Sequence, residues 1–189
     1  MNTNREILIK DIRERLSDFR YNHSLEVALS CVRLAEKYGE DVEKAYLAGI
    51  MHDVLKELSK EEMLSFFREH NIPLTKLEEN APKLWHAIAG AKYLKEKYDF
   101  SDDIVSAVRY HTTGKENMTK LEKILFVADF ISLDRDYNGV EDMRLRAENS
   151  LESAMEEGLR FTVNELSEKC LAIHPDTISA YNEIVLRNI

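Results

Sequence analysis

The sequence has 189 residues, of which 44% are hydrophobic and 32% charged, and its formal net charge is −9. This balance excludes a disordered tail protein, and no apolar run approaches the ~18 residues that a membrane-spanning helix needs. The acidic charge argues against sequence-blind binding to nucleic acid or anionic lipid, since both need clusters of Lys and Arg. It is compatible with a small anionic substrate, because a bound metal ion can reverse the local field.

The length favours one domain over residues 1–189, and no low-complexity linker divides the chain. Residues 1–10 contain no apolar stretch of the signal-peptide type. Only two cysteines occur, Cys31 and Cys170, and they lack CxxC spacing. We therefore expect a cytoplasmic protein in which both thiols are free and buried.

Few residues in the chain break helices. There are 3 Pro and 6 Gly, whereas Leu, Ala, Glu and Lys are abundant. No segment shows the convincing two-residue alternation of a strand, and there is no internal repeat. The sequence therefore predicts an all-α fold.

Two amphipathic helices are predicted at the start of the chain. The first covers about residues 4–17, and the second covers about residues 21–38, where Gly39 supplies a typical left-handed cap. We expect apolar residues at helical spacing on each helix to face the core. These residues are Ile7, Ile9, Ile12 and Leu16 on the first helix, and Leu25, Ala28, Leu29, Val32 and Ala35 on the second.

Capping signals mark the later helices. A capping box, in which Ser or Thr and a Glu three residues later cap each other, is predicted at Ser59 with Glu62 and at Thr119 with Glu122. Residues 132–140 are the clearest irregular loop. In chain order, the remaining predicted helices cover about residues 41–53, 59–71, 83–97, 101–111, 119–129, 150–170 and 176–188.

Four of the six histidines lie near predicted helix ends or among small apolar residues. A single helical histidine is usually a surface or satisfied core residue, and we interpret His70 and His174 in that way. Asp129 follows an apolar run, so its carboxylate should be buried and needs a partner, for which a metal, a salt bridge or a helix cap would serve. The full series of candidates is His23, His52, Asp53, His86, His111 and Asp129.

In this order, the series resembles the ligand pattern of the HD-domain metal-dependent phosphohydrolases. Local sequences narrow the resemblance to the YqeK type, over about residues 20–144 and more loosely over nearly the whole chain. The matching blocks are RYNHS at 20–24, HDVLK at 52–56, WHA at 85–87, RYHTTG at 109–114 and ADFI at 128–131.

The resemblance implies a single compact HD-domain helical bundle. Its metal-site core would cover about residues 18–135, with C-terminal helices at about 148–189 packing on that core. It also implies a symmetrical bis(5′-nucleosyl)-tetraphosphatase, which hydrolyses diadenosine tetraphosphate to two ADP. The alternatives are another HD-type nucleotide phosphohydrolase or phosphodiesterase, and a catalytically silent metal-dependent nucleotide sensor. No nucleic-acid or membrane partner is expected, and the C-terminal helices could form a homodimer surface.

The resemblance further implies two transition-metal ions. One would be held by His23, His52, Asp53 and Asp129, and the other by His86 and His111, with Asp53 bridging the two. The implied native metal is iron, although this ligand set also admits manganese or zinc. Two ions ~3.5–4 Å apart could share a hydroxide and clamp phosphate oxygens.

Phosphate contacts are expected from residues that flank the ligands. Lys56 lies one helical turn beyond His52, so with Asp53 it is expected to be catalytic, although a solvated lysine would look the same. Arg20 is three residues before His23, and its alternative is a surface cation. Thr112, Thr113 and Gly114 are also expected to contact phosphate, although they could instead simply end a helix. The last expected contact is Arg135. It lies in a segment, 132–135, that lacks the proline of the family's Glu-Pro-x-Arg pattern.

Overall fold

The computed structural model of the chain describes residues 5–187, and these residues form helices without any strand among them. The predicted all-α fold is therefore confirmed. Residues 4 and 188, at the ends of two predicted helices, lie outside the described residues. The elements are α1 (Arg5–Arg15), α2 (Asp18–Tyr38), α3 (Val42–Met51), α4 (Lys60–Glu69), α5 (Lys76–Glu79), the 3₁₀ helix η1 (Pro82–Leu84), α6 (Trp85–Tyr98), α7 (Asp102–Tyr110), α8 (Lys120–Ile131), α9 (Val140–Asn149), α10 (Leu151–Glu168) and α11 (Pro175–Arg187).

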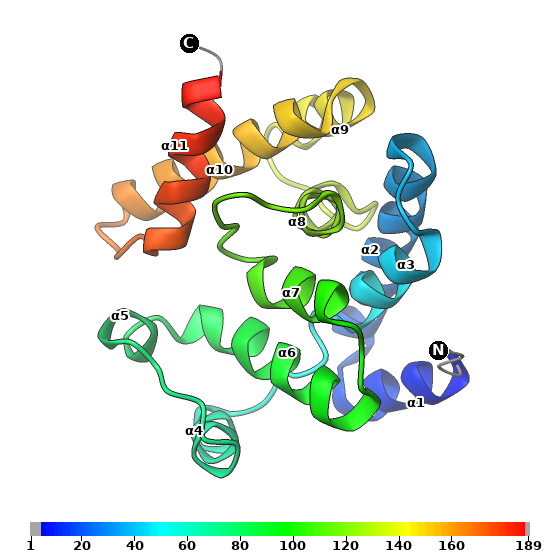
Figure 1. The fold of residues 1–189 in the computed structure, drawn as a ribbon, viewed down its shortest axis with the longest axis vertical. Coiled ribbons are helices and arrows are strands. Elements are labelled where there is room, and N and C mark those ends of the chain that lie inside the picture. Colours follow the sequence, from blue (N-terminus) through cyan, green and yellow to red (C-terminus); the bar gives the residue numbers. More distant parts are fainter. Residues whose placement is uncertain (1–4, 188–189) are drawn as a thin grey trace.

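Helix α8 occupies the middle of the bundle, where it is seen nearly end-on (Figure 1). It packs against α2, α3 and α7 on one side and against α9 and α10 on the other. Helix α6 packs on α7, and α11 packs on α10. The apolar run 124–128 of α8 is buried, as expected for a helix surrounded by others. Among the described helices, none combines the length and apolar character that crossing a membrane requires.

The predicted caps fix several helix ends. Gly39 has a φ of 68° and its N–H donates to the carbonyl of Ala35, as a left-handed C-cap requires. Both predicted capping boxes are present: the side chain of Ser59 accepts from the N–H of Glu62, and that of Thr119 accepts from Glu122. These local signals set the starts of α4 and α8.

The third predicted helix ends earlier than expected. Helix α3 stops at Met51, and residues 52–57 continue as a series of turns. Their backbone hydrogen bonds span three residues: the N–H of Val54 donates to the carbonyl of Met51, and the N–H of Lys56 donates to the carbonyl of Asp53. His52 and Asp53 therefore lie in a tightened, turn-like continuation of α3, rather than on a regular α-helix.

Three details of the sequence prediction were wrong. Ile7 is 55% exposed and Leu29 is 59% exposed, because the buried face of each helix is rotated toward neighbouring residues such as Leu8 and Cys31, both fully buried. Cys170 is exposed in the turn after α10, whereas Cys31 is buried and free as expected. Helices α5 and α9 and the short η1 were not predicted.

Helices α2 and α3 approach closely at Gly49. A Cβ atom at this position would lie 2.7 Å from the Cα of Ala28 and 3.0 Å from the Sγ of Cys31. Only glycine permits this contact, because real side chains are not found so close to a neighbouring backbone. The contact sets the distance between His23 on α2 and His52 at the end of α3.

Candidate metal centre

The six candidate ligands converge at one place in the bundle. His23 comes from α2, His52 and Asp53 from the turn after α3, and the other three from the start of α6, the C-cap of α7 and the last turns of α8. Five of the six residues are buried, and Asp129 is partly buried. Within the described chain, two overlapping groups have ligand atoms mutually within 4.8 Å: His23, His52 and Asp129, and His52, Asp53 and His111.

The first group joins α2, the turn after α3 and α8. The Nε2 atom of His23 lies 3.0 Å from Oδ1 of Asp129, and Nε2 of His52 lies 4.0 Å from the same oxygen. The rings of His23 and His52 meet edge to face, with centroids 5.4 Å apart. Two imidazole nitrogens and a carboxylate oxygen therefore point into one small space.

The second group is built around Asp53. One of its oxygens, Oδ2, lies 3.5 Å from Nε2 of His52, and the other, Oδ1, lies 3.8 Å from Nε2 of His111. His86 joins this group, with Nε2 at 3.1 Å from Oδ1 of Asp53 and 3.1 Å from Nε2 of His111. The two oxygens of Asp53 thus face different histidines, as a bridging carboxylate requires.

The protonation of two histidines follows from their hydrogen bonds. Nδ1 of His52 is 2.7 Å from the carbonyl of Gly49, and Nδ1 of His111 is 2.7 Å from the carbonyl of Val108. A carbonyl only accepts, so each Nδ1 carries the proton and each Nε2 keeps a lone pair. Nε2 of His52 is buried without a hydrogen-bond partner among the described residues. A cation bound there would satisfy it, so the residues present fit a metal ion.

The charge states suit metal binding. Burial, together with repulsion from His86 and His52, lowers the pKa of His111 to about 3, so the ring is neutral at pH 7. Burial alone would raise the pKa of Asp53 and of Asp129, but the neighbouring histidines and cations outweigh it and hold both well below the ordinary value. The centre therefore combines neutral imidazole with ionised carboxylate.

Asp134 is a residue of this cluster that was not predicted from the sequence. Its Oδ2 lies 2.7 Å from Nδ1 of His23, on the opposite side of the ring from Asp129. Burial lowers the pKa of His23, but the hydrogen bond to Asp129 and the charges of both carboxylates raise it overall. Asp134 therefore orients the ring and favours a proton on Nδ1, which leaves Nε2 for a metal ion. Its position in an irregular loop gave no signal in the sequence.

Three cationic side chains surround the cluster. Nη1 of Arg20 donates to Oδ2 of Asp53 over 3.2 Å, and Nζ of Lys56 lies 3.5 Å from Oδ1 of Asp53 and 3.0 Å from Nε2 of His86. Arg135 forms an ion pair with Asp129 and also donates from Nε to the carbonyl of that residue over 2.8 Å. These residues place positive charge around the cluster in an acidic protein.

Two further residues hold these cations in place. Arg144 donates to the carbonyls of Ile131, Ser132 and Arg135, at distances of 2.8 to 3.1 Å, and so braces the segment that carries Arg135. Glu57 accepts from the N–H and the hydroxyl of Ser17, at 2.5 and 2.7 Å. That contact ties the turn carrying Lys56 to the start of α2, which carries Arg20.

The segment after His111 ends α7 with a tight turn. Gly114 has a φ of 65° and donates its N–H to the carbonyl of Tyr110. A Cβ atom at this position would lie 3.4 Å from side-chain atoms of Ala180 and Leu159. Thr113 is buried and its hydroxyl donates to the carbonyl of Gly114, whereas the buried hydroxyl of Thr112 has no partner among the described residues.

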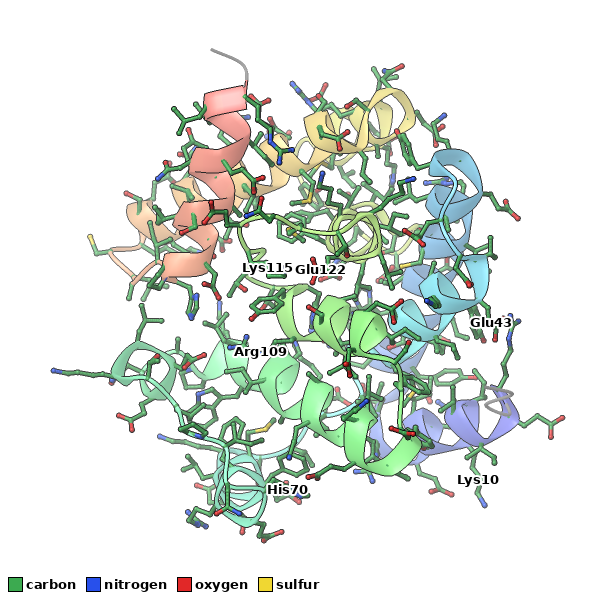
Figure 2. All side chains as sticks on the ribbon, viewed as in Figure 1. Lys10, Glu43, His70, Arg109, Lys115 and Glu122 are labelled. Carbon is green, nitrogen blue, oxygen red and sulfur yellow. The ribbon has the colours of Figure 1, made fainter. Side chains whose placement is uncertain are left out.

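Two ion pairs anchor the chain on either side of His111, one to α8 and the other to α5. Lys115 pairs with the buried Glu122 over 3.1 Å, and Arg109 pairs with Glu78 over 2.8 Å. Figure 2 shows Lys115 and Glu122 side by side near the middle of the molecule. His111 lies between these anchored residues, so its place in the cluster is fixed from both sides.

Two cavities open beside the cluster. The larger, of about 570 Å³, extends from Lys56, Thr112, Thr113 and Arg135 to the C-terminal helices. The smaller, of about 320 Å³, lies against His86. Both volumes fall in the range of small-molecule sites.

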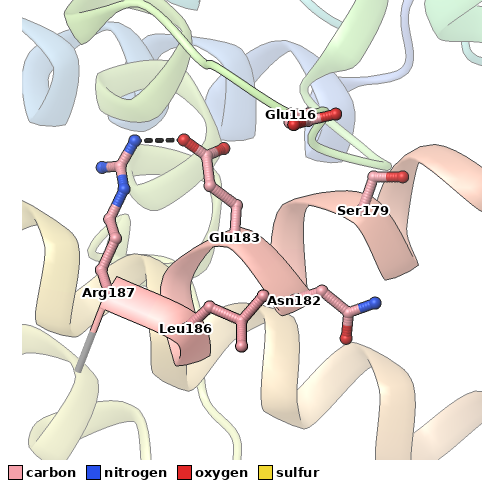
Figure 3. A pocket seen from close by; sticks show the side chains of 6 residues that line it. All are labelled: Glu116, Ser179, Asn182, Glu183, Leu186 and Arg187. Atoms are coloured by element: carbon pink, nitrogen blue, oxygen red, sulfur yellow. Dashed lines mark hydrogen bonds and ion pairs between the residues drawn. The ribbon is translucent and has the colours of Figure 1, made fainter. Parts of the chain in front are cut away.

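Other polar clusters lie apart from this centre. His70 pairs with Glu96 over 2.5 Å and stacks on Phe66, at the edge of the molecule labelled in Figure 2. A hollow on the outer face of α11 is lined in part by Glu183 (Figure 3). The carboxylate of Glu183 forms an ion pair with Arg187 and accepts a hydrogen bond from the N–H of Asn117. Neither place gathers the donor atoms that the buried cluster provides.

An all-helical bundle with clustered histidine and aspartate side chains defines a metal-binding domain of the HD type. Residues 20–134 match the family model described as "HD domain". The chain therefore belongs to the HD domain family.

Two named proteins match this chain over nearly its full length. The chain is 38% identical over 183 residues to "Bis(5'-nucleosyl)-tetraphosphatase, symmetrical" of Bacillus subtilis, covering 96% of this chain and 98% of the relative. It is also 38% identical to the protein of the same name from Halalkalibacterium halodurans, and the match covers 97% of this chain and 98% of that relative. The crystal structure of a predicted HD superfamily hydrolase involved in NAD metabolism from Clostridium acetobutylicum is 32% identical and superposes with a TM-score of 0.93, over 97% of this chain and 98% of that one.

Proposed function

We propose that this protein is a metal-dependent hydrolase that cleaves diadenosine tetraphosphate symmetrically into two ADP. The names and the nearly complete coverage of the two bacterial relatives support this activity. The observation that carries it is the convergence of six buried or partly buried metal-type ligands with three cations beside a cavity large enough for a nucleotide. Such a site suits a polyphosphate, whose crowded negative charge repels a nucleophile until that charge is neutralised.

In the overall reaction, the oxygen of one water forms a bond to a central phosphorus of the substrate. The bond from that phosphorus to the bridging oxygen breaks, and this oxygen leaves with the second ADP while protons pass to solvent. Lys56, Arg20 and Arg135 bind and orient the phosphate oxygens, since their charged groups surround Asp53 and Asp129. Lys56 stabilises the charge that develops in the transition state, because its ammonium lies within 3.0 Å of His86.

We propose that the site takes two metal ions. His23, His52, Asp53 and Asp129 would hold one, and His86 and His111 would hold the other, with Asp53 shared between them. When bound, the ions supply Lewis-acid polarisation of phosphate oxygens and lower the pKa of a water molecule. Iron is proposed as the native metal, and manganese or zinc would also fit imidazole with carboxylate.

The remaining phosphate contacts are assigned to the turn after His111. Thr112 and Thr113 line the larger cavity. The buried Thr112 hydroxyl lacks a partner among residues 5–187, so a phosphate oxygen would satisfy it. Gly114 contributes by allowing the tight turn that presents both threonines.

The activity is tested by product identification. Protein loaded with iron, manganese or zinc is incubated with diadenosine tetraphosphate, nucleoside monophosphates and cyclic dinucleotides, and the products are resolved by chromatography. Two ADP from diadenosine tetraphosphate supports the proposal. AMP with ATP, or faster turnover of another nucleotide, would overturn it. Tight nucleotide binding without turnover in any metal form would indicate a sensor instead.

Asp53→Ala tests the bridging role. We expect loss of turnover by at least about 1,000-fold and loss of bound metal, because both proposed ions share this carboxylate. Metal content is measured by elemental analysis, and activity by ADP release. Asp102→Ala, which removes an exposed carboxylate on α7, is the control and should retain both. A variant at position 53 with two ions and a normal rate would contradict the assignment.

Three properties of the whole chain complete the proposal. Residues 1–189 act as one HD domain, with a metal-site core at about 18–135 and C-terminal helices at about 148–189, because α10 packs on α8 and α11 on α10. The protein works in the cytoplasm, where its free cysteines would stay reduced. The C-terminal helices provide a homodimer surface, which size-exclusion chromatography with light scattering would test.

A further inference from the structure

We infer that the smaller of the two cavities binds the second nucleoside diphosphate half of the substrate, with Lys60 as a specificity-determining residue. This inference rests on the proposed function. The cavity is lined by Lys56, Lys60 and Lys83 together with apolar side chains and His86, and its volume is about 320 Å³. We name it the lysine cavity.

The lysine cavity and the larger cavity meet at the metal centre. Lys56, Pro82 and Lys83 line both of them. The ammonium of Lys56 also lies 3.0 Å from His86 and 3.5 Å from Asp53. The two cavities therefore form one groove that passes the reacting centre at Lys56.

Symmetrical cleavage requires a groove of this kind. The broken bond lies in the middle of four phosphates, so an identical nucleoside diphosphate extends from the reacting phosphorus in each direction. A site with one arm would hold one half and leave the other in solvent. The larger cavity provides one arm, and the lysine cavity provides a second arm on the His86 side of the centre.

The charge of the lysine cavity fits a phosphate chain. Three lysines line it, and none of the described residues that line it carries a carboxylate. The chain as a whole has a net charge of −9, so the positive charge of this cavity is opposite in sign to the net charge of the protein. Lysine ammonium groups at the rim would pair with the phosphates nearest the second nucleoside.

The floor of the lysine cavity is apolar and firmly held. Met63 and Trp85 are both nearly fully buried. The indole Nε1 of Trp85 donates to the carbonyl of Glu78 over 2.6 Å, and its ring packs edge to face on Phe67. This preformed apolar floor under a cationic rim matches a nucleoside with its phosphates.

Lys60 gives the sharpest test, because it lines the lysine cavity and not the larger one. It is the first residue of α4, directly after the capping residue Ser59. Lys76 is the matched control, since it is the first residue of α5, directly after the capping residue Thr75, and lines neither cavity. A glutamate is favourable at the first position of a helix, so both Lys60→Glu and Lys76→Glu should fold.

Trp85 supplies a readout that does not depend on turnover. It is the only tryptophan in the sequence and it lines the lysine cavity. A methylene-bridged, non-hydrolysable analogue of diadenosine tetraphosphate is titrated into zinc-loaded protein, and the fluorescence of Trp85 is followed. In parallel, KM and kcat are measured with diadenosine tetraphosphate.

We expect Lys60→Glu to raise KM and the dissociation constant of the analogue by about tenfold or more, with kcat within about threefold of wild type. Lys76→Glu should have the same KM, kcat and dissociation constant for the analogue as wild type. The inference would be overturned if Lys60→Glu had the same KM and the same dissociation constant for the analogue as wild type. If wild type still released two ADP in that case, the proposed function would remain intact. Absence of ADP release from wild type, with analogue binding still weakened by Lys60→Glu, would overturn the function and support the cavity assignment.

Discussion

In two of the buried histidines, a backbone carbonyl decides which imidazole nitrogen is available to a metal ion. The carbonyls of Gly49 and Val108 each accept from Nδ1 of a histidine three residues later, His52 and His111. Both carbonyls sit in the last turn before a helix end, where backbone acceptors lack intrahelical partners. These two candidate ligands are therefore oriented by the helix ends that carry them.

His23 depends on a side chain instead, and this leads to a prediction. Asp134→Asn should reduce metal affinity by about 10- to 100-fold, because it weakens the acceptor that fixes the His23 ring. Metal affinity is measured by competition with a chromophoric chelator. Asp136→Asn removes the same charge from the same loop and is the control. Equal affinity for both variants would show that Asp134 does not orient the ring.

The sequence predicts the candidate ligands but not the residues that support them. Histidine and aspartate at these positions are recognisable from residue type, order and neighbouring blocks. The oxygens of Asp134, Glu57 and the carbonyls of Gly49 and Val108 depend on how the chain turns in space. A pattern of residue types along the chain carries no information about such contacts.

At the scale of elements, the packing of α2 against α3 depends on Gly49. Gly49→Ala should destabilise the fold by about 1–3 kcal/mol, because its Cβ would overlap the backbone of Ala28. The melting temperature should fall by about 2 to 12 °C. Gly90→Ala is the control, since a Cβ there would make contacts of 3.6 Å or more and would favour α6. Thermal unfolding that leaves Gly49→Ala as stable as Gly90→Ala would refute the close contact.

Helix α1 is attached to α6 through a buried carboxylate. Burial of Asp11 would raise its pKa, but hydrogen bonds from Lys97, Tyr93, Arg15 and Tyr98 lower it to about 2. The folded state thus prefers the ionised form more strongly than the unfolded chain, whose pKa is near the ordinary 3.8. This contribution is complete above about pH 5 and is lost as the pH falls toward 2.

The expected size is about 1–2 kcal/mol once solvent screening is allowed for. Urea unfolding at pH 6 and pH 3 should therefore show Asp11→Asn less stable than wild type at pH 6, with a smaller difference at pH 3. Glu14→Gln, an exposed change on the same helix, should show little difference at either pH. A gap between wild type and Asp11→Asn that stays constant with pH would contradict the assigned ionisation.

Several element boundaries could be predicted because their signals are local. Gly39, Ser59 with Glu62, and Thr119 with Glu122 act on their own backbone neighbours, and all were confirmed. Helix α9 was missed because its charged sequence has few apolar positions, and it is positioned instead by contact with α8 and α10. The exposed Ile7 shows that helical spacing alone does not determine which face meets the core.

At the scale of the whole molecule, the metal centre joins five separate parts of the chain. The two proposed metal ions would together be held by α2, α6, α7, α8 and the turn after α3, and only when all of these parts are folded together. A ligand that binds only the folded state stabilises it by mass action, by about 2.7 kcal/mol at one hundred times the dissociation constant.

Removal of metal should therefore lower the melting temperature. We expect a fall of about 5 to 10 °C after dialysis against a chelator, and recovery when iron, manganese or zinc is returned. Differential scanning fluorimetry measures the shift. Asp53→Ala should melt at the same temperature with and without added metal. A chelated wild-type protein with an unchanged melting temperature would indicate that the cluster does not bind metal in the folded state.

The distance along the chain between the outermost ligands also matters during synthesis. His23 and Asp129 are 106 positions apart, yet their side chains meet at 3.0 Å. A ribosome must therefore translate through α8, and release it from the exit tunnel, before the first metal group is complete. Until then the nascent polypeptide carries isolated histidines, and loading with its cation is a late event in the life of each newly made molecule.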